Sequence, residues 1–179
     1  LLMAIPGQVL FGDYRYSEVF LLIAAAALIG YARRGLTPKL AAVLLLTTPR
    51  VWFVIEQGWS EPVAVFLLAL TTFLLIRNHI GAGLAGGVFA VAKLYLGFTG
   101  LAVLRMVFMR PRRWKGAALA MIFMGCAVTL PIALWHPHAF MRNVVWLQTL
   151  EPFREDSLSY LSWASINGFG RGSFLWAVA

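Results

Sequence analysis

Long apolar runs separated by short charged gaps dominate this sequence. A membrane-spanning helix needs about 20 mainly apolar residues, and four runs approach that length: residues 16–31, 40–55, 62–76 and 115–134. The stretch 80–109 is too long for one straight span, and the glycine-rich patch around Gly97 and Gly100 predicts a turn back into a second short helix. The pattern therefore predicts an all-α, polytopic membrane protein with about six short transmembrane helices.

Residues 135–171 are too polar and too often interrupted by proline to span a membrane. Within them, Phe140, Met141 and Val144 recur at helical spacing, which predicts a helix lying in the membrane interface. We expect residues 135–171 to form an extracytoplasmic interfacial loop within one transmembrane domain covering residues 1–179. The chain has no basic leader before its first apolar residues and stops inside an apolar run, so we expect an internal fragment of a longer protein.

Composition agrees with the membrane class. Apolar residues make up 61% of the chain and charged residues 12%, against roughly 45–50% and about 25% in soluble domains. A mean hydropathy of +0.80 also excludes disorder. The net charge of +8 would suggest nucleic acid in a soluble chain, but these charges lie in the gaps between apolar runs. We therefore expect the lipid bilayer, and not nucleic acid, as the partner.

The basic gaps predict an orientation, because short cytoplasmic loops carry an excess of Lys and Arg. They lie at Arg33 to Lys39, at Arg77 with His79, and at Arg110 to Lys115, and all three share one side only if residues 80–109 form a hairpin. The carboxylates then all fall near the opposite, outer side: Asp13, Glu18, Glu56, Glu61, Glu151, Glu155 and Asp156. One interpretation of this distribution is that the acids converge on a site at the outer side. The other is that their positions have no functional meaning, because Asp and Glu contribute little to topology; both interpretations stay open.

Residues 56–62 place two acids, an amide and an indole in one outer turn. Such a cluster suits binding of hydroxyl groups or of a phosphate-bound cation. The competing interpretation is structural: Ser60 is a suitable N-cap, Pro62 suits a first helical turn, and Glu61 there favours the helix dipole. This explains Glu61 but leaves Glu56 as a candidate for function.

Two further groups of charges are candidates for phosphate binding. Lys93 lies well inside an apolar stretch, where it either binds a lipid phosphate or extends its ammonium to the interface. Arg154 stands beside Glu155 and Asp156, and it either binds phosphate or pairs with these acids. Asp156 alone is also explained as a helix cap.

Several other motifs favour packing over chemistry. The glycines of residues 81–86 match a dinucleotide-binding spacing, but no strand precedes them, so Gly83 and Gly87 predict a face for close helix packing. His136 and His138 lack a neighbouring third ligand, so no metal site is predicted. Cys126 has no partner cysteine, and we expect it to be a small buried hydrophobe.

Taken together, four segments resemble the multi-pass bacterial glycosyltransferases of the GT-C superfamily, near glycosyltransferase family 87. They are residues 12–16, residues 56–62, residues 92–95 and residues 140–159, and they occur in this order over most of the chain. The resemblance implies a GT-C-like fold in the bacterial inner membrane. It also implies transfer of a sugar from a polyprenyl-phosphate donor to a glycan, lipid or protein acceptor on the extracytoplasmic face.

The resemblance also implies roles for individual residues. Glu56 and Glu61 would contact the sugar or the acceptor, and Lys93 and Arg154 the donor phosphate, with Asp156 in the same site. Secondary candidates are Asp13, Arg50, Tyr95, Arg142 and Gln148. The catalytic carboxylate of this superfamily lies in the first outer loop, which we expect upstream of this chain. No cofactor is implied besides the lipid donor, and metal dependence stays open.

Two other classes remain. In a transporter or flippase, Lys93 and the glycine-rich hairpin would line a substrate path. The remaining interpretation is a non-catalytic membrane scaffold.

Overall fold

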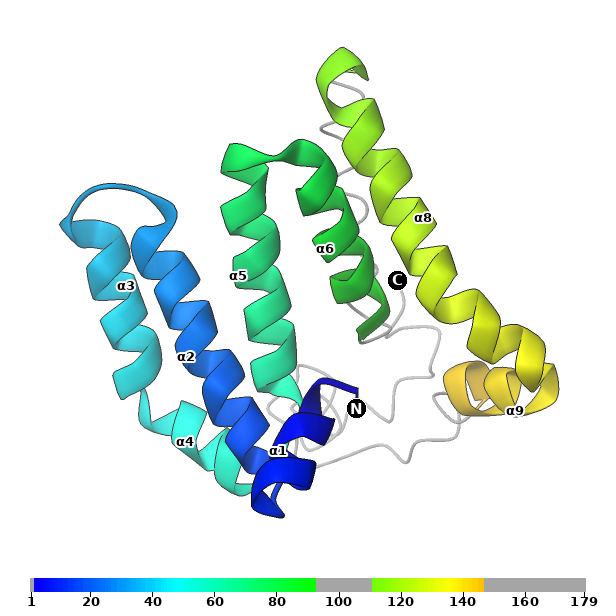
Figure 1. Ribbon diagram of the computed structural model, residues 1–179, viewed down its shortest axis with the longest axis horizontal. Helices are drawn as coiled ribbons and strands as arrows, with labels where there is room; N and C mark the ends of the chain where they lie inside the picture. Colours follow the sequence, from blue (N-terminus) through cyan, green and yellow to red (C-terminus); the bar gives the residue numbers. More distant parts are fainter. Residues whose placement is uncertain (1, 93–110, 147–179) are drawn as a thin grey trace, which may run out of the picture. The chain divides into compact units, whose positions relative to one another are not determined.

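The computed structural model describes residues 2–92 and 111–146, and every element within them is helical. Along the chain (Figure 1) these elements are η1 (Leu2–Ala4), α1 (Ile5–Phe11), α2 (Arg15–Ala32), α3 (Leu36–Thr47), α4 (Pro49–Glu56), α5 (Glu61–Arg77), α6 (His79–Ala92), α8 (Pro111–Trp135), α9 (Pro137–Met141) and the π-helical turn η3 (Arg142–Trp146). The predicted all-α class is confirmed for this part of the chain. The chain divides into two compact units, Leu1–Leu130 and Pro131–Ala179, and each is described by itself.

The helices predicted at residues 16–31, 62–76 and 115–134 correspond to α2, α5 and α8. In the second unit, α9 and η3 form the helix predicted from the spacing of Phe140, Met141 and Val144. Helix α1 was not predicted, although Pro6 in its first turn and Gly12 at its C-cap, with φ +75°, are typical helix boundary signals. The predicted turn at Gly97 and Gly100 lies outside the described residues.

Small residues bring the helices of the first unit close together. Helix α2 packs against α3 and α5, and α5 packs against α6 (Figure 1). The core between them contains Leu22, Ala25 and Leu67, each no more than 2% exposed. Alanines and glycines at such contacts allow the backbones to approach, as is typical of helices packed in a membrane.

The glycine face of α6 is filled by the backbone of α8. A β-carbon on Gly83 would collide with the carbonyl oxygen of Ala117, and one on Gly87 would lie 2.5 Å from the carbonyl oxygen of Met121. The prediction that Gly83 and Gly87 form a packing face is confirmed. Because the contacts advance along both helices together, α6 and α8 run in the same direction.

The single helix predicted over residues 40–55 is wrong, because the chain bends by 46° between α3 and α4. Pro49 has no N–H group and holds Thr48 in an extended conformation, with φ −69° and ψ 119°. Side chains next to the break donate to the last carbonyl groups of α3, and the Leu44 carbonyl also keeps its bond from the Thr48 N–H, at 3.1 Å. The Thr48 hydroxyl donates to the Leu44 carbonyl at 2.6 Å, and the Trp52 indole donates to the Leu46 carbonyl at 2.9 Å.

Two helical segments are long and apolar enough to cross a membrane, Arg15–Ala32 and Trp114–Trp135. A third span results if the bent pair α3 and α4 counts as one, and α6 is a shorter apolar helix. The described residues therefore contain two or three candidate spans. Leu119, Ile122 and Phe123 of α8 are each more than 60% exposed, as expected of side chains that face lipid.

Cys126 is exposed, so the prediction that it is buried was wrong. It lies on α8, three residues after the exposed Phe123. Other residues of α8, such as Ala117, are the ones buried in the bundle. In a helix that is apolar all round, composition does not show which side faces the core.

Candidate functional site

Basic side chains gather at one end of the first unit. Arg77 at the end of α5 donates to the Tyr31 carbonyl of α2 at 3.4 Å, and its guanidinium lies 4.0 Å from the centre of the Phe73 ring. The ring of His79, at the start of α6, lies 4.7 Å from that of Trp114, at the start of α8. The turn from α2 to α3, the turn from α5 to α6 and the start of α8 therefore share this end, which we call the basic end.

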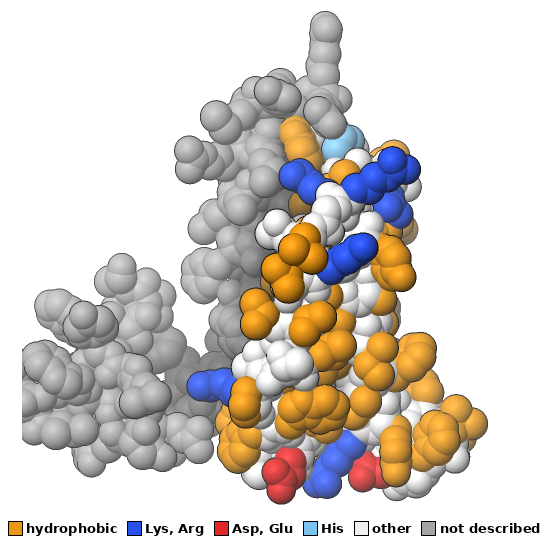
Figure 2. Space-filling view, turned by 90° about the vertical axis from the view of Figure 1, so that its left-hand side faces the viewer, with side chains coloured by type: hydrophobic (Ala, Val, Ile, Leu, Met, Phe, Trp, Pro, Cys, Tyr) orange, Lys and Arg blue, Asp and Glu red, His pale blue; other side chains and the backbone are white. Residues whose placement is uncertain are grey.

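Acidic side chains occupy the opposite end, where α2 and α5 begin. Figure 2 shows acidic side chains at one end of this face, with a basic side chain between them, most Lys and Arg gathered at the other end, and hydrophobic side chains between the two ends. The described members of this acidic end are Asp13, Glu18, Glu56 and Glu61. Four of the seven carboxylates thus lie opposite the basic turns, as the sequence predicts; the other three lie outside the described residues.

Glu18 is the most unusual of these acids, and it was not among the predicted site residues. Its side chain is 2% exposed in the first turn of α2, and its electrostatic neighbours are Arg15, Glu61 and Asp13. One of its carboxylate oxygens, Oε2, has no hydrogen-bond partner among the described residues. A buried carboxylate is normally paired or bound to a cation, so Glu18 is the clearest sign of chemistry at this end. The only signal in the sequence was an acid followed directly by a long apolar run.

Asp13 has a structural role beside it. Its Oδ1 accepts a hydrogen bond of 2.9 Å from the backbone N–H of Arg15. This bond satisfies one of the N–H groups that a helix leaves without a partner in its first turn. Asp13 is half-buried and holds the start of α2 in place.

The turn between α4 and α5 lies against the start of α2. Gly58 has φ +68°, and a β-carbon at that position would collide with the Tyr14 hydroxyl group. Around it, Glu56, Gln57 and Trp59 are exposed. The turn therefore exposes one carboxylate, one amide and one indole. Its backbone conformation at position 58 favours glycine.

Ser60 takes the N-cap position of α5, as predicted, but its side chain makes no capping hydrogen bond. Its ψ of 13° departs from the extended geometry that a capping side chain needs. Glu61 and Pro62 do lie in the first turn, as predicted, and Glu61 is half-buried there. Glu61 thus combines a favourable place for the helix dipole with proximity to Glu18.

The five predicted site residues that the structure describes lie in three places. Asp13 and Glu61 are electrostatic neighbours of Glu18, whereas Glu56 and Arg50 are exposed on α4. Arg142 is exposed in the second unit, where it lines a cavity of about 330 Å³ with His138, Met141 and Trp146. The other candidates lie outside the described residues: Lys93, Tyr95, Gln148, Arg154 and Asp156.

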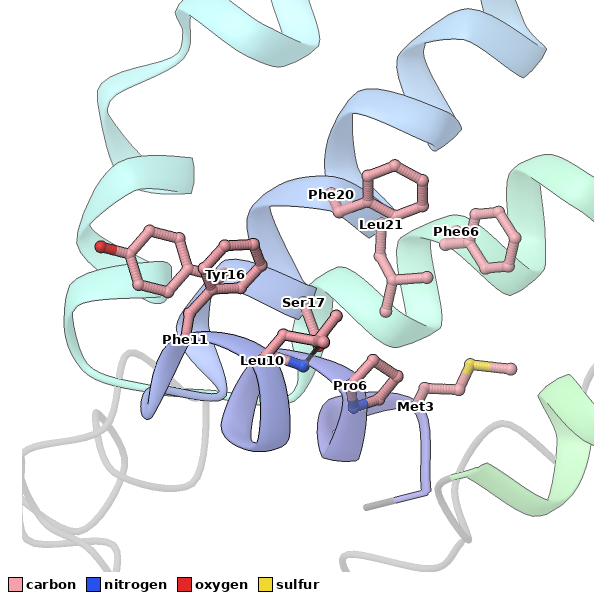
Figure 3. A pocket seen from close by; sticks show the side chains of 10 residues that line it. Met3, Pro6, Leu10, Phe11, Tyr16, Ser17, Phe20, Leu21 and Phe66 are labelled. Carbon is pink, nitrogen blue, oxygen red and sulfur yellow. Dashed lines mark hydrogen bonds between the residues drawn. The ribbon is translucent and has the colours of Figure 1, made fainter.

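An apolar cavity of about 450 Å³ lies beside the start of α2 (Figure 3). Its walls come from α1 and α2, with Phe66 of α5 on one side. Ser17 is a polar residue in this wall, and its hydroxyl oxygen already accepts from the Gly7 N–H at 2.6 Å and donates to the Ala4 carbonyl at 3.2 Å. The side chains around the cavity can therefore make little besides apolar contacts with a bound molecule.

Among residues 2–92 and 111–146, no three His, Cys, Asp or Glu side chains are close enough together to hold a metal ion by themselves. Comparisons with protein-family models, with curated proteins and with solved structures find no match for this chain.

Proposed function

We propose that this chain belongs to an integral membrane glycosyltransferase of the bacterial inner membrane. The enzyme transfers a sugar from a polyprenyl-phosphate donor to an acceptor at the extracytoplasmic face. The observation that carries the proposal is the separation of charge in the first unit, with basic turns at one end and acids at the other. Short cytoplasmic loops are rich in Lys and Arg, so the acidic end is the extracytoplasmic one.

The proposed topology has about six spans. Helix α6 begins at the basic end beside Trp114, and α8 begins there too and runs in the same direction. Two parallel neighbours in one chain need a return crossing between them. This supports assigning a further span to the connection that joins them, as the charge rule predicts.

The site is proposed on the acidic end, where both substrates would reach it from the membrane surface. At this end, Glu56 and Glu61 bind hydroxyl groups of the sugar or the acceptor. Lys93, Arg154 and Asp156 are proposed for the donor phosphate from the sequence alone. Arg50 and Arg142 are secondary phosphate ligands. Sugar transfer needs a carboxylate to deprotonate the acceptor and cations to stabilise the departing phosphate. The proposed Lys and Arg residues supply the cations, whereas the catalytic carboxylate is expected upstream of this chain.

A transporter is the less favoured function. In that interpretation Lys93 and the glycine-rich hairpin of residues 80–109 line a substrate path. Gly83 and Gly87 instead contact the backbone of α8, which leaves no space along this face of the helix.

The experiment is a transfer assay with the natural protein that contains this chain, purified into lipid nanodiscs. It measures transfer of a labelled sugar from a polyprenyl-phosphate sugar to an acceptor extract of the cell envelope. We expect Lys93→Ala and Arg154→Ala to raise KM for the donor at least tenfold with KM for the acceptor unchanged. Lys39→Ala, at the basic end, is the matched control and keeps both values. Absence of transfer from every polyprenyl-phosphate sugar tested would reject the proposal.

A further inference from the structure

The basic end brings positive charges from separate turns to one surface. The guanidinium of Arg77, the last residue of α5, donates at 3.4 Å to the carbonyl of Tyr31, in the last turn of α2. Arg33 and Arg34 follow Tyr31 by two and three residues. Three residues of extended chain span at most about 11 Å, so both arginines begin close to the same carbonyl.

The start of α8 adds a further charge to this surface. Arg77 is followed two residues later by His79, whose ring lies 4.7 Å from the ring of Trp114. Lys115 comes directly after Trp114 and is exposed. Contacts between side chains therefore join the end of α2, the end of α5 and the start of α8, where Figure 2 shows Lys and Arg gathered.

Carboxylates are absent from the segments of chain that form this surface. Residues 19–55 and 62–150 contain no Asp or Glu, and the four carboxylates in the described part of the chain lie at the acidic end. Retention of basic loops in the cytoplasm explains why each turn is basic, but it does not require the turns to meet. Like charges that meet repel one another, and a bound anion offsets this repulsion.

Arg77 is the best ordered of these cations. Its guanidinium lies 4.0 Å from the centre of the Phe73 ring and also bonds the Tyr31 carbonyl, yet the residue stays exposed. A guanidinium has five N–H donors in a planar fork that matches the oxygens of a phosphate. Because two contacts already restrict the side chain, Arg77 loses little conformational freedom when it binds such a group.

Exposed apolar side chains beside the cations indicate that the phosphate belongs to a lipid. Tyr31 and Ile80 are each more than half exposed, and so is Leu36 at the start of α3. Free phosphate would leave these side chains uncovered, whereas the acyl chains of a phospholipid would pack against them. Basic groups between helices at the cytoplasmic side are typical of sites for anionic lipid headgroups.

We propose that the basic end binds the phosphate of an anionic phospholipid from the cytoplasmic leaflet. Arg77 holds the phosphate, and Arg33, Arg34 and Lys115 supply further positive charge. The bound lipid ties the ends of α2 and α5 to the start of α8. This site is independent of sugar transfer, which is proposed for the opposite end.

Spin-labelled phosphatidylglycerol is the probe, because electron paramagnetic resonance separates lipid held by a protein from lipid of the free bilayer. The natural protein that contains this chain is reconstituted into phosphatidylcholine vesicles. We expect the phosphatidylglycerol label to associate more strongly than a phosphatidylcholine label. Arg77→Gln should reduce this preference about fivefold or more. Arg77→Lys keeps the charge without the planar fork and should restore only part of it.

Lys39→Gln is the matched control, since Lys39 is an exposed cation in the first turn of α3 at the same end. It removes the same charge as Arg77→Gln from outside the proposed site. An exposed charge of this kind is screened by salt, so the preference should change less than about twofold. Inorganic phosphate added to the vesicles should not displace the labelled lipid.

Four results would overturn the proposal: no preference for phosphatidylglycerol, an unchanged preference in folded Arg77→Gln, equal losses in Arg77→Gln and Lys39→Gln, or displacement by inorganic phosphate. Equal losses would mean general attraction to an anionic surface, and displacement would mean a site for free phosphate. A lipid preference without sugar transfer would keep this site and reject the enzyme. Transfer without a lipid preference would do the reverse.

Discussion

The carbonyl oxygen of Ala117 occupies the space where a β-carbon of residue 83 would stand, so Gly83 is the point of closest approach between α6 and α8. Gly87 repeats the contact one turn further on. This pair of glycines determines how near the two helices lie and that they run in parallel. The same geometry weakens the interpretation of α6 as the wall of a transport path.

Gly83→Ala should destabilise the bundle, because the added methyl group collides with backbone that cannot rotate away. Overpacking of this kind typically costs about 1–3 kcal/mol. Gly116→Ala is the control, since its β-carbon would have only an ordinary contact of 3.7 Å with Ile80. Thermal unfolding in detergent should show a lower Tm for the first variant and an equal or higher Tm for the second. Equal melting of both variants would mean that α6 and α8 do not pack through Gly83.

Gly58→Ala should destabilise the turn that carries Glu56 and Trp59. An L-residue at φ +68° costs roughly 1–2 kcal/mol, and the new methyl group also meets the Tyr14 hydroxyl. Gly12→Ala separates these two effects, because Gly12 has φ +75° with nothing near its β-carbon position. Unfolding measurements should show the larger loss for Gly58→Ala. The excess should shrink when Tyr14→Phe removes the hydroxyl, and an excess that persists would exclude this contact as its cause.

Ser17→Ala should weaken the attachment of α1 to α2. Ser17 is 7% exposed. Its hydroxyl group accepts a hydrogen bond from the Gly7 N–H and donates one to the Ala4 carbonyl. Removing it leaves the buried Gly7 N–H without its partner, which costs about 1–3 kcal/mol, and it also removes the second bond to the Ala4 carbonyl. Hydrogen exchange should accelerate at the Gly7 amide, whereas the amide of Leu22, in the core of α2, should keep its protection. Unchanged exchange at Gly7 would contradict this role.

Much of the fold could be predicted from the sequence, because apolar runs of helical length define α2, α5 and α8. The break between α3 and α4 was also present in the sequence as Pro49, but the surrounding apolar run outweighed it in the prediction. Helix α1 has only seven residues, too few for the periodicity of its side chains to be recognised.

The candidate site could be predicted only as a location. The charge pattern placed the acids at one end, yet it did not distinguish the exposed Glu56 from the buried Glu18. That distinction depends on the packing of α2 against α5, which joins residues more than forty positions apart. The exposure of Cys126 escaped prediction for the same reason, since α8 is apolar on the side that faces the bundle and on the side that does not.

Labelling of single cysteines should place the basic and acidic ends on opposite sides of the membrane. In a Cys126→Ala background, Thr37→Cys reports on the turn between α2 and α3, and Gln57→Cys reports on the turn between α4 and α5; both positions are exposed. A membrane-impermeant maleimide is added to intact cells, where it reaches only the outer face of the inner membrane. It should modify the cysteine at position 57 at once. Cys at 37 should react only after permeabilisation, because basic turns are retained on the cytoplasmic side. Equal reactivity from one side would mean that α3 and α4, which join these two positions, do not cross the bilayer, and the proposed extracytoplasmic site on the acidic end would then fail.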